Sequence, residues 1–203
     1  MKTRVKASAI AALILLVAAP AWSQSLDDLK NDGKNTDNVL TYGMGYHQQR
    51  YSTLKQINKQ NAKRLVPVWN VSLASSYGEQ AQPLVYNGVM YVTNAEATVA
   101  IDIASGKQLW RTPVDFDPAV PRVVCCGLSN KGPAIFNGKV YRGTLDAHLV
   151  ALDQQTGKQV WKEKVAEWKE GFSITGAPTV ANGVLITGIS GRRVRGPCFP
   201  RRL

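Results

Sequence analysis

The residues of this chain best suited to chemistry are two adjacent cysteines, Cys125 and Cys126, followed five positions later by Lys131. A third cysteine, Cys198, makes the count odd. Lys131 could stabilise negative charge that develops during a reaction, as a fixed cation does. The alternative interpretation is that Lys131 is an ordinary lysine on the solvated surface. Two buried free thiols are likewise an alternative for the pair, because cysteine is among the most buried residue types.

The remaining polar residues show no catalytic or metal-binding pattern. His47 and His148 are the two histidines, and they do not pair with metal-ligand spacing. No nucleophile motif connects serine, histidine and aspartate, and no glycine-rich phosphate loop precedes a helix. Nucleotide chemistry and acyl transfer therefore have no support.

Residues 1–23 have the pattern of a secretory signal peptide. Lys2, Arg4 and Lys6 precede an apolar run over residues 7–19, and small residues stand just before Gln24. The run is shorter than the roughly 20 apolar residues of a membrane-spanning helix. We expect cleavage before Gln24, rather than a buried first helix, and hence a periplasmic protein without stable membrane insertion.

The net charge of +11 is concentrated at the two ends of the chain. Three positive residues lie in the signal peptide and five arginines lie in residues 192–203, which leaves +3 for residues 25–191. The body of the protein is thus nearly balanced, and nucleic acid is excluded as an expected partner.

An internal repeat with an offset of 51 residues organises the chain. The segments 100–110 (AIDIASGKQLW) and 151–161 (ALDQQTGKQVW) are identical at six of eleven positions. An Asn-Gly pair precedes each segment and occurs a third time further on, so three units begin and two reach their tryptophan. These pairs are Asn87-Gly88, Asn137-Gly138 and Asn182-Gly183.

Each unit carries the signals of four short strands. Asn87-Gly88 predicts a tight hairpin between strands at 83–85 and 89–93. A second turn, in which Asp102 bonds to the backbone and Gly106 adopts positive φ, joins strands at 99–102 and 108–110. A repeated four-stranded unit of this length predicts an all-β, incomplete β-propeller of about three blades, with an open antiparallel sheet as the alternative.

The segment ahead of the repeats, residues 24–66, is expected to be helical and looped. Helical composition covers 26–31 and 53–65, with Ser25 and Ser52 as candidate N-caps. Residues 35–50 are predicted as a loop. The following stretch, 65–73, is interpreted as a strand of an incomplete first blade, with Trp69 near its middle. The blades therefore occupy residues 67–191.

Residues 38–69, the two GKQxW repeats and CCGLSNKG together resemble the pyrroloquinoline quinone (PQQ) dependent alcohol dehydrogenases of the methanol and ethanol type. The resemblance covers residues 26–191. It implies an eight-bladed propeller in which Trp110 and Trp161 dock between adjacent blades, with PQQ and a Ca²⁺ or lanthanide ion as cofactors. It also implies oxidation of a small primary alcohol to an aldehyde, with a c-type cytochrome as electron acceptor.

The resemblance also implies roles for individual residues. Cys125 and Cys126 would form a disulfide ring against one face of the PQQ, a compact ring whose geometry departs from that of ordinary bridges. Lys131 takes the place of an arginine or lysine near the quinone oxygens, without the planar fork of arginine. The remaining cofactor-binding candidates are Thr175, Ser190, Gly191 and Glu79, with Gln80 as the alternative to Glu79 on spacing.

The tail departs from the family pattern. Relatives continue after GISG with AEFG, whose glutamate is a metal ligand, whereas residues 192–203 read RRVRGPCFPRRL. A one-base insertion near codon 192 would account for this basic tail, against the alternative of a genuine one. We therefore expect an N-terminal fragment that lacks the catalytic aspartate and the metal ligands and is inactive alone. A non-catalytic propeller scaffold of the outer-membrane assembly type is the alternative function.

Overall fold

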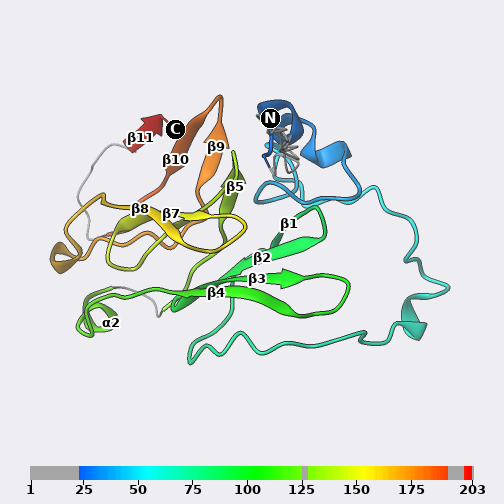
Figure 1. Cartoon of the computed structure of the whole chain (residues 1–203), viewed down its shortest axis with the longest axis horizontal. Helices are drawn as coiled ribbons and strands as arrows, with labels where there is room; N and C mark the ends of the chain where they lie inside the picture. The colour runs from blue at the N-terminus through cyan, green and yellow to red at the C-terminus, as the bar shows by residue number, and fades with distance from the viewer. Residues whose placement is uncertain (1–22, 125–127, 192–198, 203) are drawn as a thin grey trace, which may run out of the picture.

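The computed structural model describes residues 23–124, 128–191 and 199–202, and it consists mainly of antiparallel sheets. Three sheets follow one another along the chain and lie side by side (Figure 1). This arrangement confirms the predicted all-β propeller architecture. None of the helices in these ranges is long and apolar enough to cross a membrane.

The first two sheets are four-stranded and each follows a simple up-and-down order. Blade 1 consists of β1 (Leu84–Tyr86), β2 (Val89–Thr93), β3 (Ala97–Asp102) and β4 (Gln108–Pro113). Blade 2 consists of β5 (Ala134–Phe136), β6 (Lys139–Gly143), β7 (His148–Asp153) and β8 (Gln159–Lys164). Both blades have a register shift between their third and fourth strands, at Ala100/Ile101 and Ala151/Leu152. The shift falls at positions 51 residues apart, so the sequence repeat is also a structural repeat.

The third sheet, blade 3, has three strands in the order β11-β10-β9. They are β9 (Thr179–Ala181), β10 (Val184–Thr187) and β11 (Phe199–Arg202). All three blades begin with the same hairpin, in which asparagine and glycine both have positive φ: 48° and 75° at Asn87-Gly88, and 50° and 73° at Asn182-Gly183. These are the turns that the Asn-Gly pairs predict, because a two-residue turn of this kind matches the twist of the flanking strands.

Tryptophan side chains connect blade 1 to blade 2 and the segment before blade 1 to blade 1. The indole N–H of Trp110, in β4, donates to the carbonyl of Gln154 in blade 2 at 3.2 Å. A Cβ on Gly157 would lie 2.6 Å from Trp110 Cε3, so the indole packs directly on the glycine backbone. Trp69 repeats the arrangement, because its Nε1 donates to Ile103 O at 2.7 Å and its ring covers Gly106. The docking role predicted for Trp110 is thus confirmed.

The segment around Trp69 is not a regular strand, which corrects the prediction for 65–73. Val66 and Val68 are 76% and 86% exposed, and the segment runs along the periphery (Figure 1). Trp69 nevertheless contacts blade 1 in the same way as Trp110 contacts blade 2.

The N-terminal segment contains one of the two expected helices. The helix α1 (Leu26–Lys30) begins at Ser25, which forms a capping box with Asp28. The short 3₁₀ helix η1 (Asp32–Lys34) follows. The helix predicted over 53–65 is wrong, because only the 3₁₀ turn η2 (Ala62–Arg64) forms there. Asn58 and Asn61 bond to nearby backbone groups instead, an alternative to the helical pattern.

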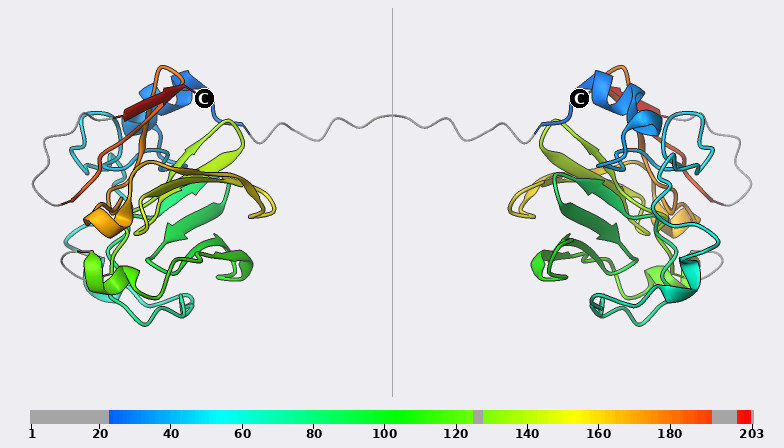
Figure 2. Two further views of the ribbon diagram at one scale, coloured as in Figure 1. Left: turned by 90° about the vertical axis from the view of Figure 1, so that its left-hand side faces the viewer. Right: turned by 90° about the vertical axis from the view of Figure 1, so that its right-hand side faces the viewer.

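Two short helical segments flank the blades. The helix α2 (Val120–Val123) lies between blades 1 and 2 and packs against η3 (Trp168–Glu170), which follows blade 2. Side views show both helical turns at the same edge of the molecule (Figure 2). A buried cluster around Val120 joins this edge to Val124 and Leu128, the residues on either side of segment 125–127.

Candidate functional site

The segments that precede the first strands of the three blades meet through their backbones. Gln82 N donates to Lys131 O at 3.0 Å, and Lys131 N donates to Thr175 O at 2.9 Å. Gln82 precedes β1, Lys131 precedes β5 and Thr175 precedes β9. The segments that lead into the first strands of three successive blades are therefore joined by backbone hydrogen bonds.

Ser190 and Gly191 join the same group through a short bridge. Ser173 and Ser190 exchange two backbone hydrogen bonds of 2.8 Å, and their hydroxyl oxygens lie 3.0 Å apart. Ser173 is two residues before Thr175, so the bridge brings Ser190 to this edge. The structure thus brings together Lys131, Thr175, Ser190 and Gly191, which the sequence analysis selected from positions far apart in the chain.

The exposure of these side chains shows what they can do. Lys131 and Ser190 are exposed and Thr175 is half-buried, so the Lys131 ammonium and the Thr175 hydroxyl are available to a ligand. The Ser190 hydroxyl instead donates to Ser173 O at 3.1 Å. A Cβ added to Gly176 would meet no atom within 4 Å, so the backbone beside Thr175 faces open space. Gly191 differs, because a Cβ there would lie 2.4 Å from the ring of Phe172. Packing on Phe172 accounts for this glycine.

Glu79 lies apart from that group. Its Oε1 accepts a hydrogen bond of 3.1 Å from Asn94 Nδ2, in the turn between β2 and β3. Asn94 is buried, and its own Oδ1 accepts from the amides of Glu96 and Ala97. The carboxylate is therefore fixed to blade 1 rather than to the backbone series of Lys131 and Thr175.

Cys125 and Cys126 lie outside the described residues. Both neighbours that bound the segment are buried, Val124 at 7% exposure and Leu128 at 7%. Leu128 is followed by Ser129 and Asn130, which are buried too, and then by Lys131. The residues on both sides of segment 125–127 are therefore buried, and Lys131 follows three buried residues.

Asn130 was missed by the sequence analysis. Its side chain is 1% exposed, and its Oδ1 accepts from Thr93 Oγ1 at 2.6 Å and from Gly132 N at 3.1 Å. Its Nδ2 donates to Gly143 O at 3.0 Å. One amide therefore bonds to blades 1 and 2 and to the residue after Lys131. The sequence signal that could have identified Asn130 is its position next to Lys131 in SNKG.

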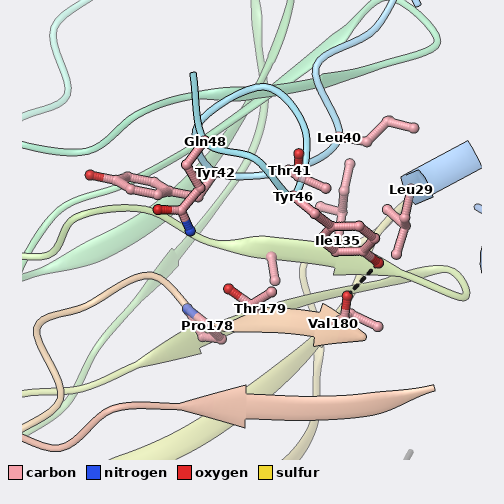
Figure 3. A pocket seen from close by; sticks show the side chains of 11 residues that line it. Leu29, Leu40, Thr41, Tyr42, Tyr46, Gln48, Ile135, Pro178, Thr179 and Val180 are labelled. Atoms are coloured by element: carbon pink, nitrogen blue, oxygen red, sulfur yellow. Dashed lines mark hydrogen bonds between the residues drawn. The ribbon is translucent and has the colours of Figure 1, made fainter. Parts of the chain in front are cut away.

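A small cavity lies elsewhere, under the N-terminal segment. It has a volume of about 50 Å³, and the phenol of Tyr46 crosses it to donate to Val180 O at 2.7 Å (Figure 3). Leu29, Leu40 and Ile135 form its apolar wall. None of the predicted site residues lines this cavity, and its size admits little more than water.

A metal site is not present among the described residues, where no group of three or more histidine, cysteine, aspartate or glutamate side chains comes together. The two histidines lie apart: His47 is in the N-terminal loop and His148 is at the start of β7. His148 Nδ1 lies 3.1 Å from Asp146 Oδ2, a carboxylate that also contacts Lys162 Nζ at 3.3 Å.

Comparison with known proteins gives consistent matches. Residues 40–192 match the family model for the glucose/ethanol/alcohol dehydrogenase β-propeller domain, designated PQQ. The chain is 44% identical to quinoprotein alcohol dehydrogenase PedH of Pseudomonas putida over 191 residues, which is 91% of this chain and 31% of that protein. It is 45% identical to the 1-butanol dehydrogenase (quinone) of Thauera butanivorans over 85% of this chain and 28% of the relative.

Solved structures agree with this result. The quinohemoprotein alcohol dehydrogenase of Comamonas testosteroni superposes with a TM-score of 0.79 at 38% identity, over 86% of this chain and 26% of that one. A europium-containing methanol dehydrogenase superposes with a TM-score of 0.76 at 34% identity, over 81% of this chain and 29% of the other. The chain spans about a third of the length of the curated relatives that it matches.

Proposed function

The chain belongs to the family of PQQ-dependent alcohol dehydrogenases, and from that premise we propose that it contributes one wall of the cofactor site of a periplasmic enzyme that oxidises primary alcohols to aldehydes. The observation that carries the proposal is the backbone series from Gln82 through Lys131 to Thr175. It joins three blades, and two of its three residues, Lys131 and Thr175, are among those expected to meet the cofactor.

The exposed groups on this edge suit a planar quinone that carries several carboxylates. Lys131 offers a cation and Thr175 offers a hydroxyl donor, beside open space at Gly176, and the exposed Ser190 lies on the same edge. Hydrogen bonds from a cation to a carboxylate are roughly twice as strong as neutral ones. The donor set therefore matches the charge of PQQ, with Cys125 and Cys126 proposed as the ring that lies against its face.

PQQ, when bound, supplies the two-electron acceptor for the hydride that leaves the alcohol carbon. In this proposal Lys131 holds its ammonium where negative charge develops and thereby stabilises it. Thr175 orients the cofactor by donating to its carboxylates. Ser190 holds the segment before Thr175 in place, because its hydroxyl donates to Ser173 O. Glu79 keeps a carboxylate at the blade 1 side of the site through its bond to Asn94.

The other components of the reaction are proposed from the family. A Ca²⁺ or lanthanide ion would act beside the cofactor, but the described residues do not provide a cluster that could hold it. We therefore derive no step through the metal and assign no catalytic base within this chain. A c-type cytochrome is proposed as the electron acceptor.

Binding of PQQ to the purified chain tests the proposal. We expect PQQ to quench tryptophan fluorescence saturably, and Lys131→Gln to weaken the affinity roughly tenfold, because a hydrogen bond to a charged group contributes roughly 1.5–3 kcal/mol. Lys131→Arg should retain most of the affinity.

Lys158→Gln provides a matched control, since it removes an exposed lysine from the turn between β7 and β8. Absence of saturable PQQ binding, or equal losses for Lys131→Gln and Lys158→Gln, would contradict the proposed site.

A further inference from the structure

A buried arginine joins the part of the proposed site that holds Glu79 to the part that holds Lys131. Arg142 lies in β6 and is 1% exposed. Burial lowers the pKa of its guanidinium to about 9, against the raising effect of Asp146, so the group remains a cation at neutral pH. An internal cation is costly unless its donors are satisfied, so the partners of Arg142 indicate what it holds in place.

Most partners of Arg142 belong to the neighbouring blade. One terminal nitrogen donates to Ala97 O at 2.7 Å and Thr98 Oγ1 at 3.3 Å, and the other donates to Asn94 O at 2.7 Å. These acceptors lie in β3 and in the turn before it. The planar guanidinium can reach both carbonyls at once, which the single ammonium of a lysine would not reproduce.

From Asn94 the connection continues to Glu79. The backbone carbonyl of Asn94 accepts from Arg142, while the side-chain amide of the same residue donates to Glu79 Oε1 at 3.1 Å. Arg142 therefore fixes the turn that holds the Glu79 carboxylate.

On the opposite side the connection continues to Lys131. Arg142 Nε donates to Gly143 O at 3.1 Å, and Asn130 Nδ2 donates to the same carbonyl at 3.0 Å. Asn130 Oδ1 in turn accepts from Gly132 N, so residues on both sides of Lys131 belong to this network. Arg142 is thus connected to Glu79 through Asn94, and to the backbone beside Lys131 through Gly143 and Asn130.

We propose that Arg142 is a positioning residue, which holds the turn of Asn94 and the segment 130–132 in one fixed arrangement so that Glu79 and Lys131 face the same ligand. The ligand in this inference is the PQQ of the proposed function. The positioning itself is a property of the chain and can be measured without the cofactor.

Amide hydrogen exchange of the full chain provides that measurement. In Arg142→Met the carbonyl of Asn94 loses its arginine donor, and the carbonyl of Ala97 keeps only the backbone amide of Asn94. We expect exchange at the amides of Gln82, Lys131 and Gly132 to accelerate by about tenfold or more beyond any change in the central strands. Arg142→Lys retains a cation without the fork, and its effect should be intermediate. It also serves as the test variant if Arg142→Met does not fold.

Ile101→Ala is the matched control, because it removes a buried apolar side chain of blade 1 but none of the hydrogen-bonding groups of Arg142, Asn94 or Asn130. Loss of overall stability alone would accelerate exchange throughout the molecule, in the control and in the Arg142 variants alike. Uniform acceleration in all variants would overturn the proposal.

PQQ titration of the same proteins gives the second result. We expect Arg142→Met to weaken PQQ binding about tenfold and Ile101→Ala to leave it unchanged. If the unmodified chain does not bind PQQ, the proposed function fails, whereas the exchange data still decide the role of Arg142. Unchanged affinity in Arg142→Met, with binding by the unmodified chain, would count against positioning.

Discussion

At the level of single residues, the groups that hold the proposed site are buried and the groups that would meet a ligand are exposed. Asn130 and Arg142 are each 1% exposed, whereas Lys131 and Ser190 face solvent. Hydrogen bonds of the buried pair fix the backbone on both sides of Lys131 before any ligand arrives. Such preorganisation lowers the cost of binding, because fewer groups must be ordered in the complex.

The adjacent cysteines provide a prediction at this level. We expect Cys125 and Cys126 to be bonded to each other in the exported protein, since disulfides persist in an oxidising compartment and the family resemblance implies this pairing. Peptide mapping of unreduced protein should yield one peptide that contains both residues and resists alkylation until it is reduced. A peptide in which either one is joined to Cys198 would contradict the pairing.

The sequence revealed the exposed members of the site more readily than the buried ones. Lys131, Thr175 and Ser190 lie in short segments that resemble the family pattern. Arg142 occupies the position that Val92 holds in blade 1, and this replacement of an apolar residue by a charged one is the signal that was available. Its acceptors in blade 1 lie 44 to 48 residues away, so only the packing of two blades identifies them.

At the level of elements, local turn chemistry determined what could be predicted. Asn-Gly hairpins specify their own geometry, and they form at the expected positions in all three blades. The helix predicted over 53–65 rests on helical composition and on Ser52 as a candidate N-cap, but the segment buries no apolar face: Leu54 is 48% and Ile57 62% exposed. Most helical stability in proteins comes from such packing, so composition alone did not produce a helix.

Docking of tryptophan on glycine leads to a prediction for the blade interface. We expect Gly157→Ala to destabilise the chain strongly, because the added Cβ would lie 2.6 Å from Trp110 Cε3 and 2.8 Å from Thr112 Oγ1. Gly183→Ala is the matched control: its φ of 73° is close to the 70° of Gly157, but no atom lies within 4 Å of the added Cβ.

Both variants carry the backbone strain of a left-handed alanine, roughly 1–2 kcal/mol. Overpacking adds roughly 1–3 kcal/mol to Gly157→Ala alone. Urea unfolding measures the difference in the free energy of unfolding. Equal losses in the two variants would show that the indole moves away at little cost.

At the level of the whole molecule, the N-terminal segment contacts all three blades. Asn87 N, in blade 1, donates to Asn38 Oδ1, and Val39 bridges Val85 of β1. Gln24 Nε2 donates to Gln154 Oε1 in blade 2, and Tyr46 donates to Val180 O in blade 3. These links hold three successive sheets against one segment, in addition to the tryptophan contacts between neighbouring blades.

The same contacts indicate where the exported protein should begin. Gln24 is 1% exposed, and Leu29, five residues later, is buried in the main core. Removal of residues beyond Gln24 would therefore take away packed side chains, whereas the charged and apolar pattern of residues 1–23 predicts a signal peptide that ends there. We expect periplasmic material to have an intact mass that corresponds to a start at Gln24. We also expect Gln24→Ala to lower the free energy of unfolding by roughly 1 kcal/mol, because the hydrogen bond to Gln154 is lost. An intact mass that includes Met1 would contradict cleavage, and a start several residues after Gln24 would contradict the role of this segment in the folded protein.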